Sequence, residues 1–162
     1  MNIEEIFKNL KWVFFDIDGV MTDGNLYYSA NGEELKVFNV KDGHGLKMLK
    51  TSGIKIAVIS GRGNEALKNR LEEMKIDIAI YNRSDKGIAF DELEKNLGNE
   101  IRNSICVGDD LPDLELFERC KLGFAVANAV DEVKEKADYI LKTDGGKGAV
   151  REICDLIVKA RR

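Results

Sequence analysis

Apolar and polar residues alternate along this chain with periods that predict alternating strands and helices. Short apolar runs, typical of buried strands, occupy 12–15, 54–59, 78–81 and 104–107, with shorter ones near Phe124 and Tyr139. Apolar residues three and four positions apart predict helices between these runs, at residues 1–10 and over the last segment. Strands that alternate with helices predict an α/β fold with a doubly wound, Rossmann-like parallel sheet covered on both faces. We expect a single domain over residues 1–162.

One segment departs from this alternation and predicts a β-hairpin at about 24–38. Asn31-Gly32 lies between short runs rich in aromatic and β-branched residues, and both residues can adopt the positive φ of a tight hairpin turn. An isolated two-stranded ribbon is marginally stable in water. We therefore expect another subunit to cover it.

The strongest candidate for chemistry is the end of the first apolar run, where Asp16 and Asp18 are followed by Gly19. Residues two apart at a strand end point the same way, toward the edge where open α/β sheets bind ligands. Two adjacent carboxylates repel each other unless a cation or a shared proton compensates, which favours a hard metal ion. Either carboxylate is also a candidate nucleophile or acid/base.

Polar groups follow three more predicted strands. They are Ser60, Lys86, and the acidic group Asp109, Asp110 and Asp113. Because the carboxyl ends of parallel strands lie along one edge, we expect one site from these residues. Taken singly, Ser60 is an ordinary helix cap and Lys86 a solvated lysine, but a cation at a helix start calls for a compensating anion.

Composition excludes several classes of function. The chain has 162 residues, a net charge of −4 and no basic face, which argues against nucleic acid as a partner. Its three widely spaced cysteines indicate reduced thiols and not a disulfide or zinc framework. We find no apolar segment of membrane length and no signal-peptide core, so we expect no membrane partner and a cytoplasmic location.

The motifs together resemble the haloacid dehalogenase superfamily of phosphotransferases. Its first signature, D-x-D-G-[VTI]-x-T-D, matches at Asp16, Asp18, Gly19, Val20, Thr22 and Asp23. Ser60 matches the second signature, Lys86 the third, and the segment 108–113 the fourth. The spacings leave no room for a large cap domain, so the resemblance implies a minimal cap.

Three further segments look like the 3-deoxy-D-manno-octulosonate 8-phosphate phosphatase family. They are the hairpin, the stretch 32–45, and the late stretch 145–152. The similarity covers nearly the whole chain. It implies that the cap is reduced to the hairpin and that the hairpins of a homotetramer associate, so that a neighbouring subunit helps to close each site.

The resemblance also implies roles for single residues. Asp16 is the expected nucleophile and Asp18 the acid/base, while Asp16, the Asp18 backbone carbonyl and Asp109 hold Mg²⁺. Ser60, Gly61 and Lys86 bind the phosphoryl group, and Asp110 and Asp113 orient the metal's surroundings and Lys86. For contacts with an acidic sugar the candidates are Lys36, Arg62 and Arg151. Arg151 is equally well explained as a residue of an exposed helix face, and His44, the only histidine, as a structural or substrate-edge residue.

Three functions follow as hypotheses. The first is a Mg²⁺-dependent phosphatase that acts on 3-deoxy-D-manno-octulosonate 8-phosphate through an aspartyl-phosphate. The second is a phosphatase for a nine-carbon acylneuraminate-type sugar 9-phosphate. The third is a non-catalytic oligomerisation module, against which the complete set Asp16, Asp18, Ser60, Lys86 and Asp109 argues.

Overall fold

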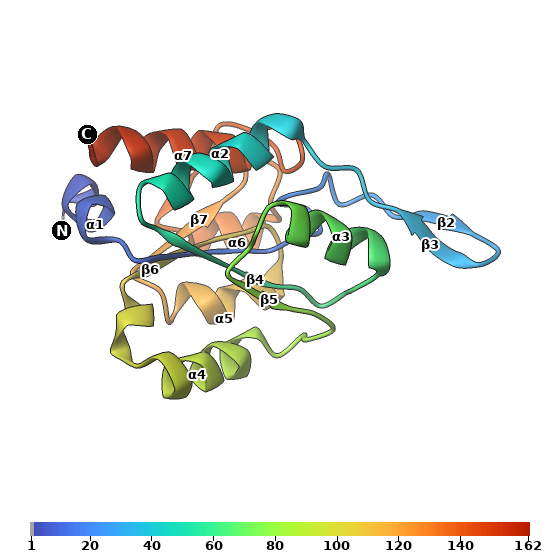
Figure 1. The fold of residues 1–162 in the computed structure, drawn as a ribbon, viewed down its shortest axis with the longest axis horizontal. Coiled ribbons are helices and arrows are strands. Elements are labelled where there is room, and N and C mark those ends of the chain that lie inside the picture. The colour runs from blue at the N-terminus through green and yellow to red at the C-terminus, as the bar shows by residue number, and fades with distance from the viewer. Residues whose placement is uncertain (1) are drawn as a thin grey trace.

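The computed structural model describes residues 2–162, and its centre is a six-stranded parallel sheet. The strand order is β5-β4-β1-β6-β7-β8 (Figure 1). The strands are β1 (Trp12–Phe15), β4 (Lys55–Ile59), β5 (Ile78–Ile80), β6 (Ser104–Gly108), β7 (Leu122–Ala125) and β8 (Tyr139–Ile140). Each neighbouring pair is parallel. The α/β fold expected from the sequence is confirmed.

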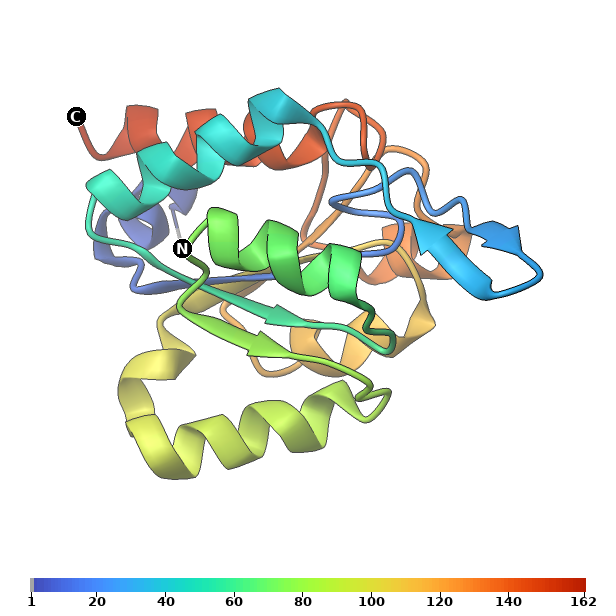
Figure 2. The same ribbon diagram turned by 45° about the vertical axis from the view of Figure 1, so that its right-hand side comes forward.

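Helices cover both faces of this sheet (Figures 1 and 2). They are α1 (Ile3–Asn9), α2 (Val40–Thr51), α3 (Glu65–Glu73), α4 (Lys86–Leu97), α5 (Leu114–Phe117), α6 (Asp131–Lys136) and α7 (Ala149–Ala160), with the 3₁₀ turns η1 (Asn99–Arg102) and η2 (Leu111–Asp113). One face packs against α1, α2, α3 and α7, and the other against α4 and α5. Over the described residues, none of the helices has the length and apolar character needed to cross a membrane.

Strand β1 is central to the core because all four of its side chains are buried. Val13 and Phe15 join the larger apolar cluster, while Trp12 and Phe14 join the smaller one on the opposite face. Full burial of such a side chain contributes about 1.5–3 kcal/mol. This burial fixes the register of β1 between β4 and β6 and thereby the position of the residue that follows it, Asp16.

The hairpin forms a separate two-stranded sheet of β2 (Tyr27–Ser29) and β3 (Gly32–Leu35), which projects from the body (Figure 2). Its turn differs from the sequence prediction. Gly32 already pairs with Ser29 as the first residue of β3, so the turn is made by Ala30 and Asn31. Only Gly32 of the predicted pair has a positive φ, of 104°.

Asp42 lies at the start of α2, where an acidic side chain suits a helix cap, but it does not cap the helix. Asn39 caps the helix by accepting a hydrogen bond from the Lys41 amide. Asp42 is buried in the first turn, where its Oδ1 accepts from the Arg151 amide at 2.8 Å. Burial raises the pKa of Asp42 to about 6, although the Arg151 amide and charge oppose the shift. Asp42 thus joins α2 to the first turn of α7.

Candidate active site

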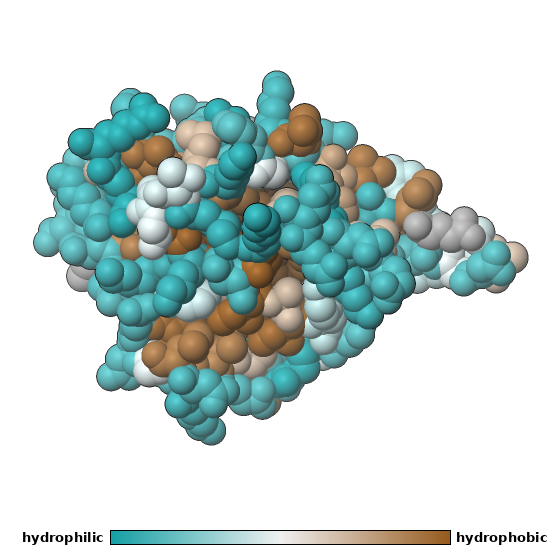
Figure 3. All heavy atoms as spheres, viewed as in Figure 1, coloured by the Kyte–Doolittle hydropathy of each residue, from teal (hydrophilic) through white to brown (hydrophobic). Residues whose placement is uncertain are grey.

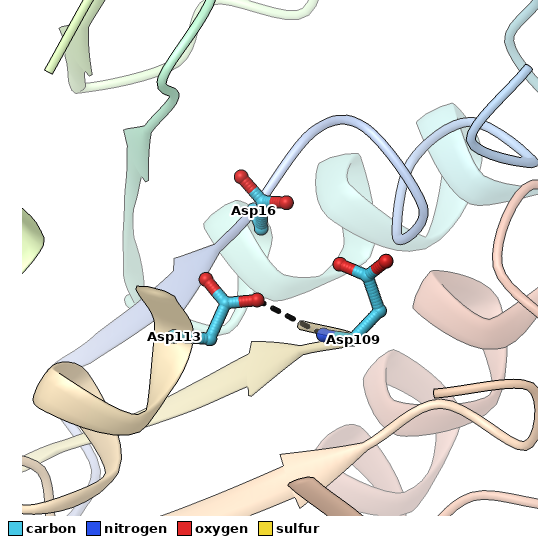
Figure 4. A group of neighbouring side chains, drawn as sticks. All are labelled: Asp16, Asp109 and Asp113. Carbon is cyan, nitrogen blue, oxygen red and sulfur yellow. Dashed lines mark hydrogen bonds between the residues drawn. The ribbon is translucent and has the colours of Figure 1, made fainter. Parts of the chain in front are cut away.

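Three carboxylates, predicted from two separate motifs, meet at the carboxyl edge of the sheet (Figure 4). Asp16 follows β1, Asp109 follows β6, and Asp113 lies in η2. One oxygen from each lies within 4.8 Å of the others. They border a pocket of about 250 Å³, lined by Asp16, Asp18, Gly61, Arg62, Ser84, Lys86, Asp109, Asp110, Pro112 and Asp113.

Lys86 carries the positive charge of this cluster. Its Nζ lies 2.7 Å from Asp16 Oδ1 and 2.5 Å from Asp113 Oδ1, and only 4% of its side chain is exposed. Burial disfavours its charge, but the two carboxylates outweigh burial and raise the pKa of Lys86. A cation at the start of α4 opposes the helix dipole, and these anions are the compensation that the sequence requires.

The carboxylates exceed what Lys86 can neutralise. Burial and the Asp113 charge raise the pKa of Asp16 to about 6 despite Lys86. Burial, followed by the charges of Asp16 and Asp113, raises the pKa of Asp109 to about 8. A second cation beside Asp16 and Asp109 would stabilise both charged carboxylates and so lower their pKa values.

The donor set fits a divalent ion bound between Asp16 and Asp109. Asp109 Oδ1 is buried and has no hydrogen-bond partner among the described residues. Asp113 has no such free oxygen, because Oδ1 contacts Lys86 and Oδ2 accepts from the Asp109 amide at 2.9 Å. Carboxylate oxygen is a ligand that Mg²⁺ prefers. Asp16 and Asp109 are therefore better placed to hold the ion than Asp113.

Asp18 lies beside the cluster and connects it to the hairpin. Lys36 Nζ donates to Asp18 Oδ1 at 2.6 Å and lies 2.9 Å from Glu33 Oε1. Burial disfavours the charge of Lys36, but its bonds to Asp18 and Glu33 prevail and raise its pKa. Arg62 also contacts the hairpin, since its Nη1 donates to the Tyr28 hydroxyl at 3.2 Å. Both candidate sugar-binding cations thus lie between the hairpin and the pocket.

Ser60 and Gly61 lie where the sequence places them, after β4. Ser60 is buried, with its Oγ accepting from the Arg62 amide at 3.3 Å, and Gly61 lines the pocket. Sequence reasoning missed Ser84 and Pro112, which also line it. Ser84 lies two residues before Lys86, so the argument from strand ends would have identified it.

Other predicted residues have different partners. Asp110 lines the pocket but caps η2, accepting from the Leu111 amide at 2.8 Å, and no described contact joins it to Lys86. Arg151 Nε donates to Asp155 Oδ1 at 2.8 Å, four residues along α7. Neither Arg151 nor His44 is among the described residues that line the pocket. This pairing of Arg151 corresponds to the alternative role on a helix face.

The loop that carries Asp18 and Gly19 packs closely against the turn at residues 145–148. A Cβ on Gly19, whose φ is +95°, would lie 1.9 Å from Asp109 Oδ2. A Cβ on Gly145 would lie 1.7 Å from the Gly19 carbonyl oxygen, and the Gly146 amide donates to the Val20 carbonyl at 3.0 Å. The 145–148 turn thus packs directly on the loop that carries Asp18.

We expect Gly145→Ala to displace this loop. The added methyl group meets backbone atoms, which cannot move aside as a side chain can, so the free energy of unfolding should fall by about 1–3 kcal/mol. Urea denaturation measures the change. The neighbouring Lys147→Ala, at an exposed position, is the matched control and should stay within about 0.5 kcal/mol of wild type. Equal stability of the two variants would contradict this packing.

Comparison with known proteins agrees with this geometry. The family model for haloacid dehalogenase-like hydrolases matches residues 80–153. The chain is 42% identical over 159 residues to the 3-deoxy-D-manno-octulosonate 8-phosphate phosphatase of Haemophilus influenzae, covering 98% of this chain and 88% of the relative. The chain belongs to the haloacid dehalogenase-like hydrolase family. Membership in this family confirms the resemblance inferred from the sequence.

Solved structures of the same family have the same fold. The cobalt-bound deoxy-D-mannose-octulosonate 8-phosphate phosphatase of Haemophilus influenzae aligns with a TM-score of 0.91 at 42% identity, over 96% of this chain and 91% of that one. The enzyme from Moraxella catarrhalis, described in complex with magnesium, phosphate and the sugar acid, aligns with a TM-score of 0.92 at 40% identity, over 98% and 91%. These haloacid dehalogenase-like hydrolases match almost the full length of the chain.

Proposed function

We propose that this protein is a Mg²⁺-dependent phosphatase whose substrate is 3-deoxy-D-manno-octulosonate 8-phosphate. The convergence of Asp16, Asp109 and Lys86 in one pocket is the observation that carries the proposal. The near-complete alignment with phosphatases of that name, at about 42% identity, supports the choice of substrate. A magnesium ion in the Moraxella catarrhalis structure supports the choice of metal.

Asp16, Asp109 and the backbone carbonyl of Asp18 would hold the metal ion. The unpartnered Asp109 Oδ1 and the raised pKa values of both side chains are what a bound cation would relieve. When bound, Mg²⁺ supplies positive charge that offsets the negative charge on the transferring phosphoryl oxygens.

Asp16 is the proposed nucleophile. Lys86 holds its Oδ1 at 2.7 Å, which fixes the direction of the carboxylate. A carboxylate oxygen of Asp16 bonds to phosphorus as the bond from phosphorus to the sugar oxygen breaks, which leaves an aspartyl-phosphate. The Ser60 hydroxyl, the Gly61 amide and the Lys86 ammonium group bind the phosphoryl oxygens. Water then attacks phosphorus, releasing inorganic phosphate and the Asp16 carboxylate.

Asp18 is the proposed acid and base of these two steps. It gives a proton to the departing sugar oxygen and later takes one from the attacking water, so that protons balance over the cycle. Lys36 Nζ lies 2.6 Å from Asp18 Oδ1, so a substrate carboxylate bound by Lys36 would lie close to the proposed acid and base.

Phosphate release from purified protein tests the substrate assignment. With Mg²⁺, we expect turnover of 3-deoxy-D-manno-octulosonate 8-phosphate with a kcat/KM well above that for an acylneuraminate 9-phosphate. A preference for the nine-carbon substrate would keep the phosphatase and change its sugar. No release from either, by protein that folds and binds Mg²⁺, would favour a non-catalytic module.

The hairpin supports assembly into a homotetramer as part of this proposal. Tyr28, Leu35 and Val37 are 62%, 59% and 54% exposed, and brown, hydrophobic atoms lie where the ribbon joins the body (Figure 3). An isolated ribbon of this kind gains stability when another surface covers it. A second subunit on the hairpin would also lie close to Lys36 and Arg62, beside the pocket.

Sedimentation velocity at micromolar concentration should report a tetramer for the wild-type chain. Replacing Tyr28 and Leu35 with aspartate should dissociate it, because each carboxylate would be buried in an apolar contact without a partner. Ile88→Asp, at a 54% exposed position in α4, serves as the control and should leave the tetramer intact. A wild-type monomer would contradict assembly through the hairpin.

A further inference from the structure

A second pocket, larger than the one beside Asp16, lies between α2 and the carboxyl-terminal end of α3, which are neighbours on one face of the sheet (Figures 1 and 2). We call it the α2–α3 groove. Its volume is about 630 Å³, and its lining includes Gly43, His44 and Lys47 of α2 with Arg70, Met74 and Lys75 at the end of α3. None of its described lining residues lines the Asp16 pocket.

The groove is positively charged in a chain whose net charge is −4. Lys47, Lys50, Arg70 and Lys75 line it against a single acid, Glu73. Lys50 pairs with Asp77 at 3.0 Å, outside the lining. Lys47 and Lys75 have no ion pair within the part of the chain that the structure describes. An anion in the groove would be attracted by these cations.

Arg70 is held in the groove by contacts on several sides. Its guanidinium carbon lies 5.8 Å from the centre of the Phe38 ring, and its Nη1 lies 2.9 Å from Glu73 Oε2. Its Nε is buried and has no acceptor among the described residues. A Cβ on Gly43 would lie 2.6 Å from Nη2, so the glycine leaves the space that the guanidinium needs. An ordered arginine with an unused buried donor is suited to bind an oxyanion.

Lys75 provides a further cation from an unusual backbone position. Its φ is +53°, a left-handed conformation at the end of α3 that favours glycine or asparagine. The same residue is among those that line the groove. Val40 and Met74 supply apolar surface between the charged groups.

We infer that the α2–α3 groove is a binding site for one small organic anion per chain, a carboxylate, sulfonate or phosphate attached to an apolar body. The volume lies in the range of small-molecule sites, about 300–1,000 Å³. Its apolar lining takes the body of the ligand, and Arg70, Lys47 and Lys75 take the charge. This site is separate from the proposed phosphatase site and does not depend on it. It also accounts for the Gly43-His44 stretch, which the active-site pocket does not use.

Fluorescence titration with 8-anilino-1-naphthalenesulfonate, an apolar ring system with one sulfonate, tests this site in the folded protein. We expect one probe per chain, an affinity that falls with added salt, and binding at least tenfold weaker for the uncharged analogue N-phenyl-1-naphthylamine. Arg70→Met and the double variant Lys47→Met/Lys75→Gly should each weaken the sulfonate by about tenfold. Glycine suits the positive φ at position 75, so the lysine charge is removed without backbone strain.

Lys68→Met is the matched control, because Lys68 lies on α3 but pairs with Glu65 outside the groove. It should bind the sulfonate as wild type does. Equal binding by the groove variants and wild type, or equal affinity for the charged and uncharged probes, would overturn the inference. So would variants that change the oligomeric state and not probe affinity, since the groove would then be a contact between copies of the chain.

Discussion

Replacing Asp16 with asparagine is expected to lower kcat for phosphate release by at least about 10³-fold, since it removes the proposed nucleophile. Asparagine has the shape of aspartate, and Lys86 keeps its other partner, Asp113, at 2.5 Å. The variant should therefore still fold, and its lower kcat would reflect the missing nucleophile. Single-turnover phosphate release, with circular dichroism as a check on folding, measures this effect.

Trapping of the intermediate separates the nucleophile from a residue that only binds metal. When wild-type protein is mixed with substrate and quenched in acid, mass spectrometry should find a phosphoryl group on the peptide that contains Asp16. Asp16→Asn should give no labelled peptide, whereas Lys147→Ala, at an exposed position outside the pocket, should be labelled like wild type. Wild-type turnover by Asp16→Asn would show that the nucleophile is another group.

The sequence predicted the positions of the candidate site residues well where these residues follow buried strands. The apolar run 12–15 can only be buried as a central strand, so the direction and place of Asp16 were determined by the core. The same argument placed Asp109 after β6, and the parallel topology then required the two to meet. Lys86 was predictable because a cation at a helix start requires anions nearby.

The prediction was weaker where a polar residue chooses among several partners. Asp42 and Asn39 both suit a helix cap, and the choice depends on the Arg151 amide, 109 positions away in the sequence. Asp110 was expected to orient Lys86, but its carboxylate satisfies the adjacent Leu111 amide. Such choices are decided by tertiary contacts that local sequence does not encode.

Mg²⁺ should reverse a loss of stability that the metal-free protein shows as pH rises. The pKa of Asp109 is raised from 3.8 to about 8, and that of Asp16 to about 6, so the folded state holds protons that the unfolded state releases. The stability that these two protonated groups contribute is fully present below about pH 4 and is lost as pH rises through about 6 and then about 8. Saturating Mg²⁺, at about 100 times its Kd, should add about 2.7 kcal/mol at pH 8.

Asp109→Asn should separate the carboxylate crowding from every other source of pH dependence. The amide cannot ionise, so the metal-free variant should be more stable than wild type at pH 8 by about 1–3 kcal/mol and should gain little from Mg²⁺. Asp110→Asn is the matched control, because asparagine caps a helix as well as aspartate does and this side chain is exposed. Thermal melts of wild type and both variants at pH 5 and pH 8, with and without Mg²⁺, measure these differences in stability. If Asp109→Asn were less stable than wild type at pH 8 without metal, its charge would be stabilising in the folded state, and the argument for a cation between Asp16 and Asp109 would fail.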